Sequence, residues 1–156
     1  MAVSPKYRNI VQKSLIAAAG IAPHTLDPVG IDACWTTMFL AIKEKSNSSF
    51  KVAPQIIVNA AITSFYCSSF EDLIIFPIKA AIIFAMFRIL CNCSIPSVSA
   101  CCKIYLTYKF AVASIDLMNK RSYSSYSNIM LEFGNLFKGL PSVDEIKDIA
   151  KIYKGE

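Results

Sequence analysis

Apolar residues recur at helical spacing along most of the 156-residue chain, and this pattern predicts a series of hydrophobic helices. Prolines and short polar stretches interrupt the pattern and mark the helix ends. The predicted helices cover residues 10–22, 31–45, 54–67, 70–91 and 98–119. We expect two hairpins, in which 10–22 pairs with 31–45, and 98–119 pairs with either 54–67 or 70–91.

The C-terminal tail has a different pattern. A linker rich in serine and tyrosine covers residues 121–127, and two amphipathic helices follow over Ile129–Lys138 and Ser142–Tyr153. Ser142 and Glu145 have the spacing of a capping box, in which a serine and a glutamate satisfy backbone N–H groups at the start of a helix. The second of these helices is therefore expected to begin at Ser142.

Length and pattern together predict the fold class. A chain of this length is long enough for one domain with a proper core and too short for two ordinary ones. We expect an all-α fold, a compact bundle of hydrophobic helical hairpins over residues 1–120. The linker and the amphipathic C-terminal helical pair, residues 121–156, are expected to pack on the same domain.

The composition leaves open whether the protein is surrounded by water or by lipid. Apolar residues make up 54% of the chain and charged residues only 17%, against about 25% charged residues in typical soluble domains. The mean hydropathy is +0.46. These values exclude a disordered chain, collagen and a coiled coil, and they leave a hydrophobic globular domain or a membrane protein.

The strongest candidate for a membrane span is Leu73–Cys91, whose mean hydropathy is roughly +2.2 on the usual scale. Lys79 and Arg88 count against it, because each charge costs about 2.5–3.5 kcal/mol near the centre of a span. A second candidate, Val52–Phe70, is uncharged but much more polar. Helices buried in a soluble core show the same pattern, so membrane association is favoured only narrowly.

Basic residues interrupt the most hydrophobic part of the chain, residues 52–115. In a membrane each of them needs a partner or a path to water. The candidate polar positions are Lys79, Arg88, Lys103 and Lys109. Lys79 and Arg88 are expected either to line a polar seam or to lie at the two membrane interfaces. The alternative is that both reach solvent from the rim of a soluble bundle.

The net charge of +5 does not indicate a nucleic-acid partner, because the basic residues are scattered along the chain instead of clustered in one run. Their densest group flanks a hydrophobic segment, which favours the edge of a membrane over a phosphate groove. Over residues 116–156 the acidic and basic residues balance. The basic N-terminus favours a cytoplasmic location for that end of the chain.

Candidate chemistry is sparse, and we predict no enzyme, no cofactor and no metal. Four cysteines lie close together in the sequence, at Cys91, Cys93, Cys101 and Cys102. Their spacing is a poor match for a zinc site, because adjacent helical side chains diverge by about 100°. Buried apolar thiols are favoured over zinc or over acylation near a membrane. His24 is the only histidine, so metal sites that need several histidines are excluded.

A turn motif connects the first two predicted helices. Its residues are Pro23, Asp27, Pro28 and Asp32. Asp27 before Pro28 is typical of a turn, and Asp32 is expected in the first turn of the following helix, where an anion is favourable. These structural roles are favoured over a pair of catalytic carboxylates.

The same region carries a family resemblance. A helix of small residues (17–20) leads through the turn motif to a helix with Met38, Ala41 and Ile42, and Ile95-Pro96 precedes a second small-residue helix. This arrangement resembles the small helical-hairpin domain of unknown function that is appended to some bacterial membrane-associated GTPases. The resemblance covers about residues 10–118 and implies a helical bundle that interacts with membranes.

The chain departs from that family at two points. The later helix has no glycine where the family is rich in glycine, and the chain has no GTPase domain. Alanine, serine and cysteine can take the place of glycine in close helix packing.

The function we expect is that of a non-enzymatic, membrane-associated helical protein that acts through self-association or as an accessory to a protein partner. The alternatives are a soluble cytoplasmic helical module that binds an apolar ligand or a partner helix, and a small immunity or inhibitor protein.

Overall fold

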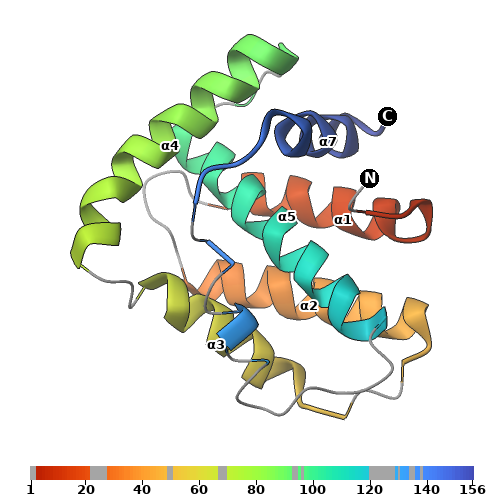
Figure 1. Cartoon of the computed structure of the whole chain (residues 1–156). Helices are drawn as coiled ribbons and strands as arrows, with labels where there is room; N and C mark the ends of the chain where they lie inside the picture. Colours follow the sequence, from red (N-terminus) through yellow and green to blue (C-terminus); the bar gives the residue numbers. More distant parts are fainter. Residues whose placement is uncertain are drawn as a thin grey trace.

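A computed structural model of the chain describes residues 3–21, 28–48, 51–66, 70–92, 95, 97–119, 129, 131–133, 136–137 and 139–156. Within these residues all regular secondary structure is helical, which confirms the predicted all-α bundle (Figure 1). The main helices are α1 (Pro5–Ala19), α2 (Pro28–Ser46), α3 (Pro54–Tyr66), α4 (Phe70–Cys91), α5 (Val98–Asn119) and α7 (Val143–Lys154).

Helix α5 is the centre of the bundle. It packs against α1, α2, α4 and α7, and nearly all of its residues between Ala100 and Met118 are buried. Two of the helix pairs predicted from the sequence are in contact, since α1 packs on α2 and α4 packs on α5. Helix α3 packs on α2. Of the two partners considered for α5, the structure therefore pairs it with residues 70–91.

An aromatic cluster fills the core between α2 and α5. The ring of Trp35 stacks on Phe110 with 4.7 Å between centroids, and Phe39 and Phe133 lie 6.3 and 5.6 Å from Phe110. The indole Nε1–H of Trp35 donates to Thr107 Oγ1 at 2.9 Å, so this buried polar group is satisfied. Because Phe133 follows the linker in sequence, the cluster joins the C-terminal part of the chain to the central helices.

The predicted starts of the first two helices are too late. Helix α1 begins at Pro5 and α2 at Pro28, whereas the sequence pattern placed these starts at residues 10 and 31. Proline fits the first turn of a helix as well as a connection, because it has no N–H and its φ is already helical. Pro28 of the turn motif therefore begins α2, and Asp32 lies in the second turn, not in the first.

The last helix has the cap that the sequence predicts at its start, and it ends at Lys154, one residue later than predicted. Ser142 Oγ accepts a hydrogen bond from the Glu145 N–H at 3.1 Å, and Gly155 closes the other end with a left-handed φ of 80°. Helix α7 packs on α1, α4 and α5. Of the predicted helix Ile129–Lys138, the described residues 129 and 131–133 are helical and 136–137 form a turn. The proposed boundary at residue 120 follows the end of α5, and the linker lies outside the described residues, so this division stays a prediction.

Candidate functional site

The basic residues picked out in the hydrophobic segment do not come together in one site. Two of them lie on α5 and face different neighbours. Lys103 is fully buried, and its Nζ donates to the carbonyl oxygen of Ile21 at 3.4 Å. Lys109 forms an ion pair with Glu145 of α7, with 3.2 Å between Nζ and Oε2. Lys103 therefore links α5 to the segment that follows α1, and Lys109 links α5 to α7.

The two basic residues of α4 lie on different sides of that helix. Lys79 is partly buried, and its Nζ donates to the carbonyl oxygen of Phe137 at 2.9 Å. Arg88 is exposed, and its guanidinium group lies 5.2 Å from the centroid of the Phe84 ring, within the range of a cation–π contact. These contacts do not form the polar seam that was considered for Lys79 and Arg88.

The turn motif is only partly described. Pro23 and Asp27 lie outside the described residues, and Pro28 begins α2. The Asp32 carboxylate accepts a hydrogen bond from the Thr36 hydroxyl at 3.1 Å. Asp32 is therefore placed on the surface of α2, one turn before Thr36.

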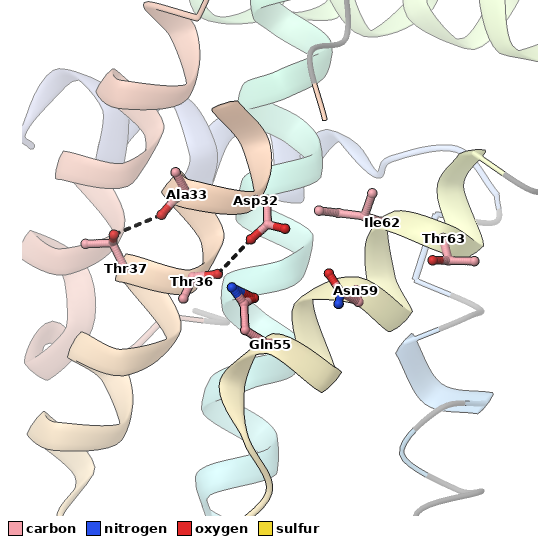
Figure 2. A pocket seen from close by; sticks show the side chains of 8 residues that line it. All are labelled: Asp32, Ala33, Thr36, Thr37, Gln55, Asn59, Ile62 and Thr63. Atoms are coloured by element: carbon pink, nitrogen blue, oxygen red, sulfur yellow. Dashed lines mark hydrogen bonds between the residues drawn. The ribbon is translucent and has the colours of Figure 1, made fainter. Parts of the chain in front are cut away.

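An open groove of about 650 Å³ lies between α2 and α3. Figure 2 shows Asp32 and Thr36 of α2 turned toward Gln55 and Asn59 of α3, with Thr63 further along α3. Carboxylate, amide and hydroxyl groups line the groove together with the apolar side chains of Ala33 and Ile62.

The outer side of α4 is an exposed apolar surface, which we call the α4 apolar face. It consists of residues at three- and four-residue spacing, all of them exposed: Ile78, Ala81, Ile82, Ala85 and Ile89. Ile89 is 80% exposed and Ile78 59%. The opposite side of α4 carries the buried residues Ala80, Ile83 and Phe87, which face the core. A helix that is apolar on both sides normally has both sides covered.

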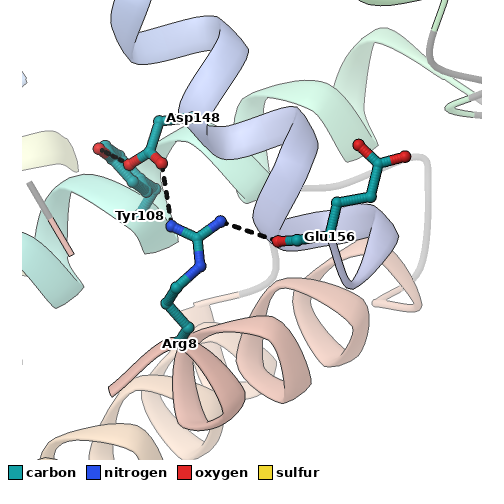
Figure 3. A network of polar contacts seen from close by, with 4 residues as sticks. All are labelled: Arg8, Tyr108, Asp148 and Glu156. Atoms are coloured by element: carbon teal, nitrogen blue, oxygen red, sulfur yellow. Dashed lines mark hydrogen bonds and ion pairs between the residues drawn. The ribbon is translucent and has the colours of Figure 1, made fainter. Parts of the chain in front are cut away.

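A polar network fastens α7 to the rest of the bundle (Figure 3). The Asp148 carboxylate of α7 accepts a hydrogen bond from the Tyr108 hydroxyl of α5 at 2.9 Å. It also forms an ion pair with Arg8 of α1 at 3.1 Å. Arg8 also donates to the backbone oxygen of Glu156 at 3.0 Å. Three helices far apart in the sequence therefore meet at one carboxylate. We call these four residues the α7 latch.

Two tyrosines of α5 have a raised pKa next to the carboxylates of α7. Burial raises the pKa of Tyr108, and its hydrogen bond to Asp148 raises it further. Burial also raises the pKa of Tyr105, together with the charge of Glu145 and a hydrogen bond to it. In both cases the fold favours the neutral phenol.

These shifts predict a loss of stability in alkaline solution. The pKa of each of these tyrosines is higher in the folded than in the unfolded protein. Its contribution to stability is therefore fully present only below the unfolded pKa, which is about 10 for tyrosine. Above that pH the free energy of unfolding falls, by up to about 1.4 kcal/mol per pH unit for each tyrosine. We expect urea unfolding at pH 8 and pH 11 to show this loss.

The control is the double variant Tyr105→Phe and Tyr108→Phe, which has no phenol at either position. It is expected to lose less stability than the parent over the same pH interval. An identical loss in both proteins would contradict the assignment of the alkaline effect to these two tyrosines.

The described cysteines are free thiols, of which Cys101 and Cys102 are buried and Cys34 and Cys91 are partly buried. Burial raises the pKa of Cys34 and of Cys102 to about 11, which disfavours the reactive thiolate. Cys93 of the predicted cluster lies outside the described residues. Among the residues that the structure describes, no group of three or more His, Cys, Asp or Glu side chains could hold a metal ion.

One helix of the described part of the chain is long and apolar enough to cross a membrane. It is α5, and 78% of its most apolar window is buried inside the protein, as in the central helix of a soluble bundle. Comparison of the chain with protein-family models, curated proteins and solved structures gives no match. The resemblance to the domain appended to GTPases therefore stays a prediction.

The α4 apolar face and the α7 latch are not evident from the sequence alone. The residues of the face do have a signal, since they recur on one side of a helix. However, apolar residues occur on all sides of α4, so the pattern alone does not tell which side the core covers. For the latch, the sequence separation of 140 residues between Arg8 and Asp148 left no local signal.

Proposed function

We propose that the protein is a non-enzymatic membrane-docking module, whose α4 apolar face lies in the interface of a lipid bilayer. The observation that carries the proposal is this exposed row of isoleucine and alanine on a helix whose other side is in the core. Contiguous apolar patches of this kind are typical of interaction sites. In this role the protein would serve as a peripheral anchor or as an accessory to a partner at the membrane.

The geometry favours docking over spanning. One side of α4 lies in the core, so a bilayer can cover only its other side. The inner side of α4 packs on α5 and α7, which carry the ion pair of Lys109 and Glu145. With the folded bundle on its inner side, α4 can lie in the plane of the interface and insert only its outer apolar side.

The alternative functions have less support in the structure. The groove between α2 and α3 is open and has a mixed polar and apolar lining, whereas a site for an apolar ligand normally encloses most of the ligand surface. A protein partner, an inhibited toxin or a second copy of the chain would have to cover the α4 apolar face. These partners remain outcomes of the experiment below.

Sedimentation with lipid vesicles tests the proposal. The parent protein is expected to sediment with vesicles of phosphatidylcholine and phosphatidylglycerol. The double variant Ile78→Asp and Ile89→Asp is expected to bind at least about tenfold more weakly, because burial of each isoleucine contributes about 1.5–3 kcal/mol. Both positions are exposed, so the variant should fold like the parent, which circular dichroism can check.

The matched control is Leu40→Asp, which places a charge on an exposed apolar position of α2, a helix that packs on α1, α3 and α5. We expect it to bind vesicles like the parent. The proposal is wrong if the parent stays in the supernatant at every lipid concentration, or if the α4 variant binds as well as Leu40→Asp. Self-association of the parent without lipid, abolished by the α4 variant, would assign the face to a second copy.

A further inference from the structure

Helix α7 separates its charges by side, although its sequence is neutral. It carries three acidic residues, Asp144, Glu145 and Asp148, and three basic residues, Lys147, Lys151 and Lys154. Glu145 and Asp148 are only partly exposed, because Glu145 pairs with Lys109 and Asp148 with Arg8 and Tyr108. In the sequence, the charges of α7 are balanced, whereas the structure turns two of the three acidic side chains of α7 toward the bundle.

The three lysines of α7 all face solvent. Lys147, Lys151 and Lys154 are exposed, and their spacing of four and three residues places them on one side of the helix. Asp144 is also exposed, but it lies in the first turn, at the opposite end from Lys154. The outer side of α7 is therefore predominantly basic.

This basic side is continuous with the outer side of α4. Helix α7 packs on α4, beside its C-terminal half (Figure 1). Lys154 Nζ reaches across to the carbonyl oxygen of Cys91 at 2.9 Å, and Cys91 Sγ lies 3.9 Å from the backbone oxygen of Ile146. Arg88 precedes Cys91 by three residues, so it lies on the edge of α4 that is next to α7. We call Arg88, Lys147, Lys151 and Lys154 the basic band.

We propose that the basic band binds the anionic phosphate groups of phospholipids while the α4 apolar face enters the interface beside it. This inference rests on the proposed function and adds a lipid class to it. The arrangement fits a membrane surface because an exposed apolar row and an exposed basic row lie side by side, as in helices that bind anionic bilayers. Arginine and lysine are both phosphate ligands, and the arginine fork can contact two oxygens.

The test neutralises part of the basic band and measures binding to two kinds of vesicle. One kind contains phosphatidylcholine alone, and the other also contains phosphatidylglycerol. The variant is Lys147→Gln with Lys151→Gln, because Lys154 also contacts Cys91. Each lysine near an anionic surface contributes about fivefold to binding. We expect the double variant to bind the anionic vesicles about thirtyfold more weakly than the parent, and the neutral vesicles equally well.

The matched control removes the same charge elsewhere. Lys45→Gln with Lys51→Gln changes two exposed lysines near the end of α2 and the start of α3, and it is expected to bind within about twofold of the parent because distant charges are screened. High salt should weaken binding of the parent to anionic vesicles and leave its binding to neutral vesicles unchanged.

The outcomes separate this inference from the function on which it rests. If the parent binds neutral and anionic vesicles equally, the basic band does not recognise anionic lipid, and the docking proposal stands. If the parent binds no vesicles, the docking proposal itself is overturned. If the band variant loses no more binding to anionic vesicles than the control does, the inference is also overturned. An acidic protein then becomes the next partner to test.

Discussion

Replacement of Phe110 by alanine is expected to lower the free energy of unfolding by about 3–5 kcal/mol. Phe110 is fully buried on α5. Its ring contacts Trp35 of α2 in a stacked pair, with Phe39 and Phe133 on other sides. Removal of the ring leaves a cavity at the point where three parts of the chain meet. Because domains of this size have a total stability of about 5–15 kcal/mol, the variant should lose a large part of it.

Urea unfolding measures this effect, with the fluorescence of Trp35, the only tryptophan, and far-ultraviolet circular dichroism as two probes. The control is Phe110→Leu, which keeps most of the side-chain volume and is expected to cost less than half as much. A loss of less than about 1 kcal/mol for Phe110→Ala would contradict the central role of the aromatic cluster, since a full cavity costs more than that.

The sequence predicts the helices well where their ends have strong local signals. Helix α5 covers residues 98–119 as expected, and the structure shows why its start is well defined, since Ser97 Oγ accepts a hydrogen bond from the Ala100 N–H at 3.1 Å. The starts of α1 and α2 were wrong because Pro5 and Pro28 have an ambiguous signal. A proline is equally compatible with a connection and with the first turn of a helix.

The candidate site was much less predictable, because it depends on contacts between distant parts of the chain. Lys79 and Lys109 were picked out as charges in a hydrophobic segment, but their partners lie 58 and 36 residues away. Periodicity carries no information about such partners. The same holds for the lysines of α7, because only the packing of Glu145 and Asp148 against the bundle leaves the helix with a basic outer side.

Replacement of Asp148 by alanine is expected to cost about 2–4 kcal/mol, mainly by loosening α7. The Asp148 side chain is only 12% exposed and that of Arg8 18%, so their ion pair is poorly screened by water. Its removal leaves the Tyr108 hydroxyl and one side of the Arg8 guanidinium without their acceptor, and an unsatisfied buried partner costs more than the bond itself contributes. Hydrogen exchange should show faster opening of α7 than of α5, because α5 keeps its contacts with α1, α2 and α4.

The variants Asp148→Asn and Asp144→Ala separate the causes. Asparagine still accepts a hydrogen bond from Tyr108 but has no charge. The Asp148→Asn variant should therefore lose less free energy of unfolding than Asp148→Ala, but more than none. Asp144 is exposed in the first turn of the same helix, where an acidic side chain contributes about 0.3–1 kcal/mol through the helix dipole. If Asp148→Ala costs no more than Asp144→Ala, the latch does not hold α7. In that case the apolar contacts of Ile146, Ile149 and Ile152 with the core would suffice.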